Sequence, residues 1–256
     1  MVFYKTEEEV AIIKESAKIL AEVHGLIASS IKEGVKTSFL DELAYRFIID
    51  RGAYPSFKDY QGFPNSLCIS VNEVVVHGIP DNYLLKQGDI VSIDCGVLYK
   101  GFHSDSAYTY GVGEISDDVK KLLDTTKESL FIGIENAKAG NRLGDVGNAI
   151  QVHVETNGFS VVRELVGHGI GKSLHESPEV PNYGKKGNGF KLLDNLVIAI
   201  EPMVNMGRKN IYQDSDGWTI RTSDKKPSAH FEHTVLVNKN NPEVLTSFKF
   251  IEEALN

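Results

Sequence analysis

The feature that most constrains the fold is an internal repeat between the two halves of the chain. Gly34 and Gly140, each two positions after a lysine, lie 106 positions apart. A duplication of this length indicates two copies of one supersecondary unit. The apolar positions that coincide at this offset pair Leu40 with Val146, Leu43 with Ala149, Ala44 with Ile150 and Ile48 with Val154, and Gly52 falls on Gly158.

Each copy is predicted to contain two helices followed by antiparallel strands. Thr6 and Glu9 have the spacing of a capping box and start the first helix, whose apolar residues recur at helical spacing. A second helix starts near Thr37 and is ended by Gly52. We therefore expect an α+β fold in which residues 1–256 form one catalytic domain. Its halves, roughly 6–112 and 113–238, would pack about a pseudo-twofold axis, with a cleft along the seam.

Paired acidic residues stand at matching places in the two copies. Asp94 ends the apolar run Ile90–Ile93, and Asp105 follows the Gly101 turn, so a hairpin would bring both carboxylates together. Taken alone, this pair is more simply explained as one surface and one turn residue. The repeat matches Asp94 with Glu201, and we expect Glu232 to be the counterpart of Asp105.

The four acids and His168, which lies between Gly167 and Gly169, form a candidate metal site. Hard oxygen donors with one nitrogen suit Mn(II), Fe(II), Co(II) or Zn(II). Four carboxylates neutralise two divalent ions, so we expect two metals about 3.5 Å apart. Asp105 and Glu232 would bridge them, and Asp94 would be a terminal ligand. Such a site polarises a carbonyl and activates water near neutral pH.

Histidines near these motifs are candidates for catalysis. His77 precedes Gly78-Ile79-Pro80, and His175 ends a glycine-rich stretch. Either can donate a hydrogen bond to a scissile carbonyl or to the oxyanion that forms from it. We interpret His24 and His153 as structural, and assign no role to His103 and His233.

Composition excludes some classes of function. The net charge of −8 argues against a nucleic-acid surface as the main function. Two cysteines do not form a secreted disulfide framework, and we expect both thiols to be reduced. We see no signal peptide and no apolar run long enough to cross a membrane. A cytoplasmic protein without a membrane partner is expected.

Several segments, in this order, resemble type I methionine aminopeptidases of the bacterial type, from peptidase family M24. The resemblance covers about residues 6–237, and the chain shows neither an N-terminal zinc-binding extension nor a long insert. It implies the pita-bread fold, in which two α/β halves enclose a dinuclear metal site. The segments are His77-Gly-Ile-Pro80, His103-Ser-Asp105, Gly167-His-Gly-Ile-Gly-Lys-Ser-Leu-His175, Ile200-Glu-Pro-Met203 and Phe231-Glu-His-Thr234.

The resemblance also implies roles for individual residues. Glu201 would be both ligand and proton shuttle, and His77 and His175 would contact the substrate and the transition state. The methionine side chain would be held by Tyr60, Phe63, Cys68 and Trp218, and a structural monovalent cation would lie near Asn72, Val74 and Ser228. The chain departs from the bacterial pattern at Phe57, Phe63, Leu174 and His230, which affects the pocket and leaves the ligand set intact.

The implied reaction is removal of the initiator methionine from nascent chains with a small second residue. The implied partner is a nascent N-terminus, and the ribosome is a further partner to consider. We expect a monomer. Two alternatives remain: an X-Pro aminopeptidase or dipeptidase of the same fold, and a non-catalytic peptide-binding module on that fold.

Overall fold

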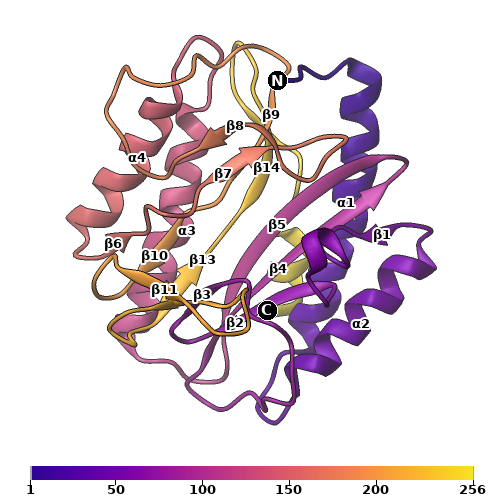
Figure 1. Ribbon diagram of the computed structural model, residues 1–256, viewed down its shortest axis with the longest axis vertical. Coiled ribbons are helices and arrows are strands. Elements are labelled where there is room, and N and C mark those ends of the chain that lie inside the picture. Colours follow the sequence, from indigo (N-terminus) through magenta and orange to yellow (C-terminus); the bar gives the residue numbers. More distant parts are fainter. Residues whose placement is uncertain (1, 256) are drawn as a thin grey trace.

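Two pairs of helices flank a layer of antiparallel strands. The computed structural model describes residues 2–255; α1 and α2 lie at one side of the strands and α3 and α4 at the other (Figure 1). The first copy comprises α1 (Glu7–Ser30), α2 (Thr37–Asp50), β1 (Tyr54–Pro55), the 3-10 helix Tyr60–Gly62, β2 (Leu67–Val71), β3 (Val74–Val76), β4 (Ile90–Tyr99) and β5 (Phe102–Gly111).

The second copy and the C-terminal extension follow the same order of helices before strands. The elements are α3 (Asp117–Asn136), α4 (Leu143–Thr156), β6 (Ser160–Val161), β7 (Gly167–Gly169), β8 (Glu176–Val180), β9 (Val197–Ile200), β10 (Met203–Asn205), β11 (Ile211–Gln213), β12 (Ile220–Thr222), β13 (Ser228–His230), β14 (His233–Leu236), β15 (Glu243–Val244) and α5 (Lys249–Leu255).

The helices have the spacing of the repeat. The bounds of α2 and α4 differ by the 106 positions found in the sequence. The predicted capping box is present at α1, where the Glu9 amide donates to Thr6 Oγ1 and the Thr6 amide donates to Glu9 Oε2. One apolar core includes buried residues of both copies, such as Leu40 and its repeat partner Val146. The repeat therefore reflects equivalent helices that pack on a common interior.

The first copy supplies one long, unbroken hairpin. Strands β4 and β5 pair along ten residues each, and β4 also pairs with β1 and β2. Lys100 and Gly101 both have positive φ, 48° and 83°, as a two-residue turn with the twist of a hairpin requires. The predicted hairpin is confirmed, and it places Asp94 opposite Ala107 and Asp105 opposite Gly96.

The second copy breaks the equivalent strands. Ile200 pairs with His233 and Met203 with His230, so Glu201 and Glu232 face each other in the gap between these pairs. Pro202 lies in this gap, where it has no N–H to donate to a ladder. The two expected matches cannot both hold in this register: with Asp94 set against Glu201, Glu232 falls on Ala107, two positions from Asp105.

Hydrogen bonds join the copies beside the seam. The Asp105 amide donates to Thr234 Oγ1 at 3.0 Å, and that hydroxyl donates to the Asp105 carbonyl at 2.8 Å. The Glu232 amide donates to the Ala107 carbonyl at 2.9 Å. Within residues 2–255, no helix has the length and apolar character needed to span a bilayer.

Candidate metal centre and substrate pocket

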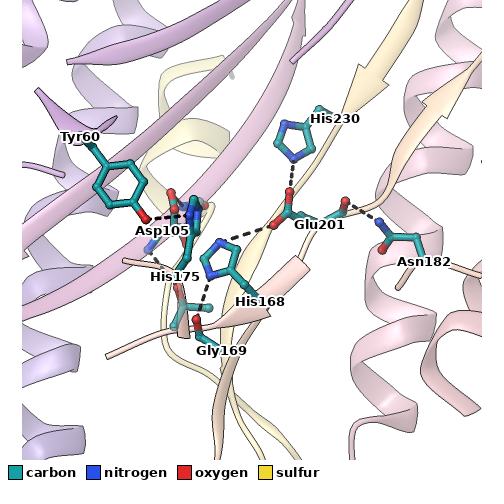
Figure 2. Close-up of polar contacts among 10 residues, drawn as sticks. Tyr60, Asp105, His168, Gly169, His175, Asn182, Glu201 and His230 are labelled. Carbon is teal, nitrogen blue, oxygen red and sulfur yellow. Dashed lines mark hydrogen bonds and ion pairs between the residues drawn. The ribbon is translucent and has the colours of Figure 1, made fainter. Parts of the chain in front are cut away.

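All five predicted ligands line one cavity between the copies. The cavity has a volume of about 170 Å³. Asp105 and Glu232 are almost fully buried, at 3% and 2% exposure. Ligand atoms of Asp105, His168 and Glu232 all lie within 4.8 Å of one another, and His168 Nε2 lies 3.6 Å from Glu201 Oε1. Figure 2 shows Asp105, His168 and Glu201 close together, each from a different segment of the chain.

The His168 ring is held in one orientation by its glycine-rich strand. A Cβ on Gly167 would lie 2.3 Å from the Ala199 carbonyl oxygen, so only glycine allows β7 to approach β9 this closely. His168 Nδ1 lies 2.9 Å from the Gly169 carbonyl oxygen, which can only accept a hydrogen bond. Nδ1 therefore carries the proton, and Nε2 presents its lone pair toward the acids, as a metal ligand requires.

The electrostatics of the cluster fit a divalent cation. Burial raises the pKa of Asp94 to about 7 and that of Glu201 to about 8, and it raises the pKa values of Asp105 and Glu232 well above their usual range. Among the described residues, Asp94 Oδ1 and Glu232 Oε1 are buried without a hydrogen-bond partner. Such oxygens are costly unless a proton or cation meets them. The residues present therefore fit a metal centre.

Burial keeps the cavity imidazoles neutral. It lowers the pKa of His77 to about 4 and that of His168 to about 3, and it also lowers the pKa of His175. Tyr60 Oη and His175 Nδ1 lie 3.0 Å apart in a hydrogen bond. When the phenol donates this bond, the neutral His175 ring carries its proton on Nε2. His175 can then donate from Nε2 to an oxygen of a bound molecule.

The predicted pocket residues also come together. Phe63 and Trp218 meet edge to face with ring centroids 5.2 Å apart, and His77 lies with its ring centroid 6.5 Å from that of Trp218. His77 has a φ of 58°, which few non-glycine residues adopt and which is typical of functional sites. The cavity wall comprises Phe57, Tyr60, Gln61, Phe63, Cys68, Leu174 and Trp218. Gln61 was not predicted to line the cavity, and the sequence indicates it only through its position next to Tyr60.

The two thiols are buried, and the residues that differ from the bacterial pattern lie at or beside the cavity. Cys68 and Cys95 are free and buried, as expected, on paired strands. His230 is buried, with Nε2 3.7 Å from Glu201 Oε2. Phe57 and Leu174 line the cavity. These departures from the bacterial pattern therefore all lie at the site, and none removes a predicted ligand.

Four histidines were given a structural role or none. His24 Nε2 lies 2.9 Å from the Ser106 carbonyl, and His153 Nε2 lies 3.1 Å from Glu128 Oε2 near the surface. His103 Nδ1 is bonded to Ser56 Oγ, and His233 Nδ1 to Thr246 Oγ1. None of the four lines the cavity of the metal cluster.

The predicted monovalent-cation residues are neighbours. The Ser228 amide donates to the Asn72 carbonyl at 2.9 Å, and Ser228 Oγ donates to Asn205 Oδ1. Asn72 and Val74 also line a larger cavity, of about 500 Å³, that contains none of the five predicted ligands. We assign the chemistry to the smaller cavity because the acids and imidazoles are there.

Comparisons with known proteins agree with this fold. Residues 11–239 match metallopeptidase family M24. A methionine aminopeptidase of Clostridium perfringens is 54% identical over 249 residues, which cover 97% of this chain and 100% of that protein. The crystal structure of methionine aminopeptidase from Rickettsia prowazekii is 40% identical with a TM-score of 0.95, covering 96% of this chain and 100% of that one.

A solved prolidase from Pyrococcus furiosus shows the same fold at greater distance. It has a TM-score of 0.77 at 24% identity, and the match covers 95% of this chain but 65% of that one. Fold and site together define a metal-dependent hydrolase with the pita-bread fold. The chain belongs to metallopeptidase family M24.

Proposed function

We propose that this protein hydrolyses the N-terminal methionine from nascent polypeptides with a small second residue. One observation carries the proposal: the acid and imidazole cluster lies in a cavity of about 170 Å³ lined by Phe63, Cys68 and Trp218. An unbranched thioether packs well against aromatic rings and sulfur. The high identity to proteins named methionine aminopeptidase supports the same activity.

We further propose how the site is occupied. Asp94, Asp105, His168, Glu201 and Glu232 would hold two divalent ions, with Asp105 and Glu232 shared between them. Co(II), Mn(II), Fe(II) and Zn(II) all suit this donor set. The ions would supply Lewis acidity toward the scissile carbonyl and lower the pKa of water. A structural monovalent cation near Asn72, Val74 and Ser228 remains part of the proposal.

Protein groups would carry the protons. Glu201 would take a proton from the attacking water and return it to the leaving amine, as a carboxylate within reach of both can do. His175 would donate from Nε2 to the oxyanion, since its Nδ1 is bonded to Tyr60. His77 would contact the same carbonyl from the side of Trp218. Phe63 and Trp218 would position the methionine side chain.

The domain organisation, the location and the oligomeric state that we propose follow from the same argument. We infer one catalytic domain over residues 1–256, because buried residues of both copies share a core and the cluster draws on both copies. A cytoplasmic monomer that acts on emerging N-termini fits this substrate, and ribosome contact would bring the two together.

The direct test is methionine release from the peptide Met-Ala-Ser, before and after chelation and on metal repletion. We expect release that chelation abolishes and metal restores. An X-Pro substrate should not be cleaved at a comparable rate. Absence of methionine release on repletion, or preference for X-Pro, would overturn the proposal. Stoichiometric metal binding without any hydrolysis would instead indicate a peptide-binding module.

A further inference from the structure

A buried ion pair lies outside the metal cluster and has no role in the chemistry above. Lys5 Nζ donates to Glu176 Oε2 at 2.7 Å, and the two side chains are only 3% and 5% exposed. Burying two charges costs desolvation energy that their attraction often only offsets. Net stability is therefore a weak explanation for this pair, and its position in the fold is more informative.

Glu176 lies next to the two segments that carry His168 and His175. It directly follows His175, and its backbone pairs with Gly169, the neighbour of His168. Its second oxygen, Oε1, accepts a hydrogen bond from the Ser173 amide at 3.3 Å. One oxygen of the Glu176 carboxylate thus accepts a hydrogen bond from the turn of residues 171–175, and the other accepts one from Lys5.

Lys5 comes from an N-terminal segment that is fixed at several points. The Lys5 amide donates to the Asn195 carbonyl at 2.8 Å, and Tyr4 forms a β-bridge with Leu196. Val2 forms a bridge with Ser177, one residue after Glu176. The ammonium also donates to the Phe3 carbonyl at 3.1 Å. The Lys5 ammonium is therefore held by a backbone segment that these hydrogen bonds and β-bridges fix in place.

The turn of residues 171–175 packs directly on this ion pair. A Cβ on Gly171 would lie 2.3 Å from Lys5 Cε and 2.6 Å from Glu176 Oε1. The Gly171 carbonyl in turn accepts from the His103 amide at 2.8 Å. Gly171 therefore lies in direct contact with both members of the ion pair, and any larger residue there would displace them.

We propose that Lys5 is a positioning residue that holds His175 in place through Glu176. The His175 ring is otherwise held by Tyr60 Oη, while its centroid lies 4.3 Å from that of His168 (Figure 2). Without the ammonium, the buried Glu176 carboxylate would keep only the Ser173 amide as a partner, and it would move toward water together with its neighbour His175. The proposal rests on the proposed function, in which His175 contacts the transition state.

The test compares Lys5→Met with Lys14→Met. Lys14 lies on α1 and pairs with Glu243 at the same 2.7 Å distance, but both side chains are exposed. A misplacement of about 1 Å costs roughly 100-fold in rate. We therefore expect kcat for Met-Ala-Ser to fall about 10- to 100-fold in Lys5→Met, with KM nearly unchanged, and no change in Lys14→Met.

Two readouts do not depend on activity. In metal-free protein, the imidazole ¹⁵N resonances of His175 should shift in Lys5→Met while those of His24 stay in place. Calorimetric metal affinity should stay at the wild-type value. If Lys5→Met fails to fold, the double variant Lys5→Met with Glu176→Gln removes both charges and is judged by the same measurements.

The outcomes separate the two proposals. Wild-type kcat in Lys5→Met overturns the positioning role, as does a fall in kcat with unmoved His175 resonances or with lost metal affinity. If the metal-loaded wild type fails to release methionine, the proposed function is overturned, and the His175 resonances still report whether Lys5 positions the ring.

Discussion

The two copies share their helices but differ in how they present chemistry. In the first copy, ten-residue strands carry Asp94 and Asp105 on one unbroken hairpin. In the second, the equivalent strands break at Glu201 and Glu232, and the same copy brings His168 and His175 to the cavity and His230 beside Glu201. The candidate ligands are thus divided unequally: two lie on one continuous hairpin, and three come from shorter, interrupted segments.

The largest expected effect is a difference in kcat between substitutions at two matched positions, Asp94 and Glu201. Glu201→Gln should lower kcat by about 10²- to 10⁴-fold, because it removes a proton shuttle as well as a ligand. Asp94→Asn at the matched position should lose less, and excess metal should restore part of its activity because only a ligand is changed. Steady-state kinetics across a metal titration decide this. Equal, metal-insensitive losses would show that the two copies share one role.

Metal removal tests whether both copies depend on the same ions. A ligand at 100 times its Kd stabilises the folded state by about 2.7 kcal/mol. Chelation should therefore lower the melting temperature by about 5–10 °C for a chain of this size. Calorimetry should show one transition with and without metal. Two separate transitions after chelation would indicate that the copies unfold independently and would contradict one cooperative domain.

The stability of the metal-free protein should depend on pH through the same acids. Burial raises the folded-state pKa of Asp94 to about 7 and that of Glu201 to about 8, far above their unfolded values. The folded state then binds more protons than the unfolded state, so stability is complete near pH 4 for these groups and is lost as pH rises through 7 and 8. Between pH 6.5 and 8.5 the free energy of unfolding should fall by about 3 kcal/mol.

Urea denaturation at the two pH values measures this change. Asp94→Asn should reduce the fall, whereas Asp50→Asn, at the exposed end of α2, should leave it unchanged. A metal-free protein that gains stability toward pH 8.5 would contradict the assignment.

A smaller effect on activity is expected at the aromatic pair of the pocket, to which each copy contributes one ring. Phe63→Ala removes an aromatic pair with Trp218 that contributes about 0.5–1.5 kcal/mol beyond burial. We expect kcat/KM for Met-Ala-Ser to fall about tenfold and discrimination against N-terminal leucine to weaken. Phe39→Ala, an exposed ring on α2, is the control. Unchanged discrimination would place the methionine side chain elsewhere.

The smallest effect concerns a histidine of the second copy that lies outside the site. His153 on α4 meets Glu128 near the surface, and such pairs contribute at most about 1 kcal/mol. His153→Gln should keep kcat within twofold and change the free energy of unfolding by less than about 0.5 kcal/mol. A large loss of activity would show that catalytic histidines extend beyond the cavity.

Much of this arrangement could be predicted from local sequence. The helix bounds, the capping box at Thr6 and the hairpin turn at Gly101 depend on residues close in the chain, which is why they were recovered. The four acids and the imidazole predicted as ligands line one cavity, because a long repeat and specific motifs tied distant segments together.

Features set by strand register and tertiary packing were not accessible. Whether Asp94 matches Glu201 or Asp105 matches Glu232 depends on which residues pair across β9 and β14, and acid type alone does not give that register. Gln61 enters the cavity through a loop without period. The pair of Lys5 with Glu176 joins residues 171 positions apart, and neither carries a motif of its own.

The hydrogen bonds between Thr234 and Asp105 have a consequence for synthesis. They join residues 129 positions apart, and Asp105 is one of the acids that line the cavity. While the chain is synthesised from its N-terminus, the first hairpin can form early, but the candidate site cannot assemble until Glu232 and Thr234 have been added. An incomplete chain that ends before Glu232 would therefore lack part of the candidate metal centre.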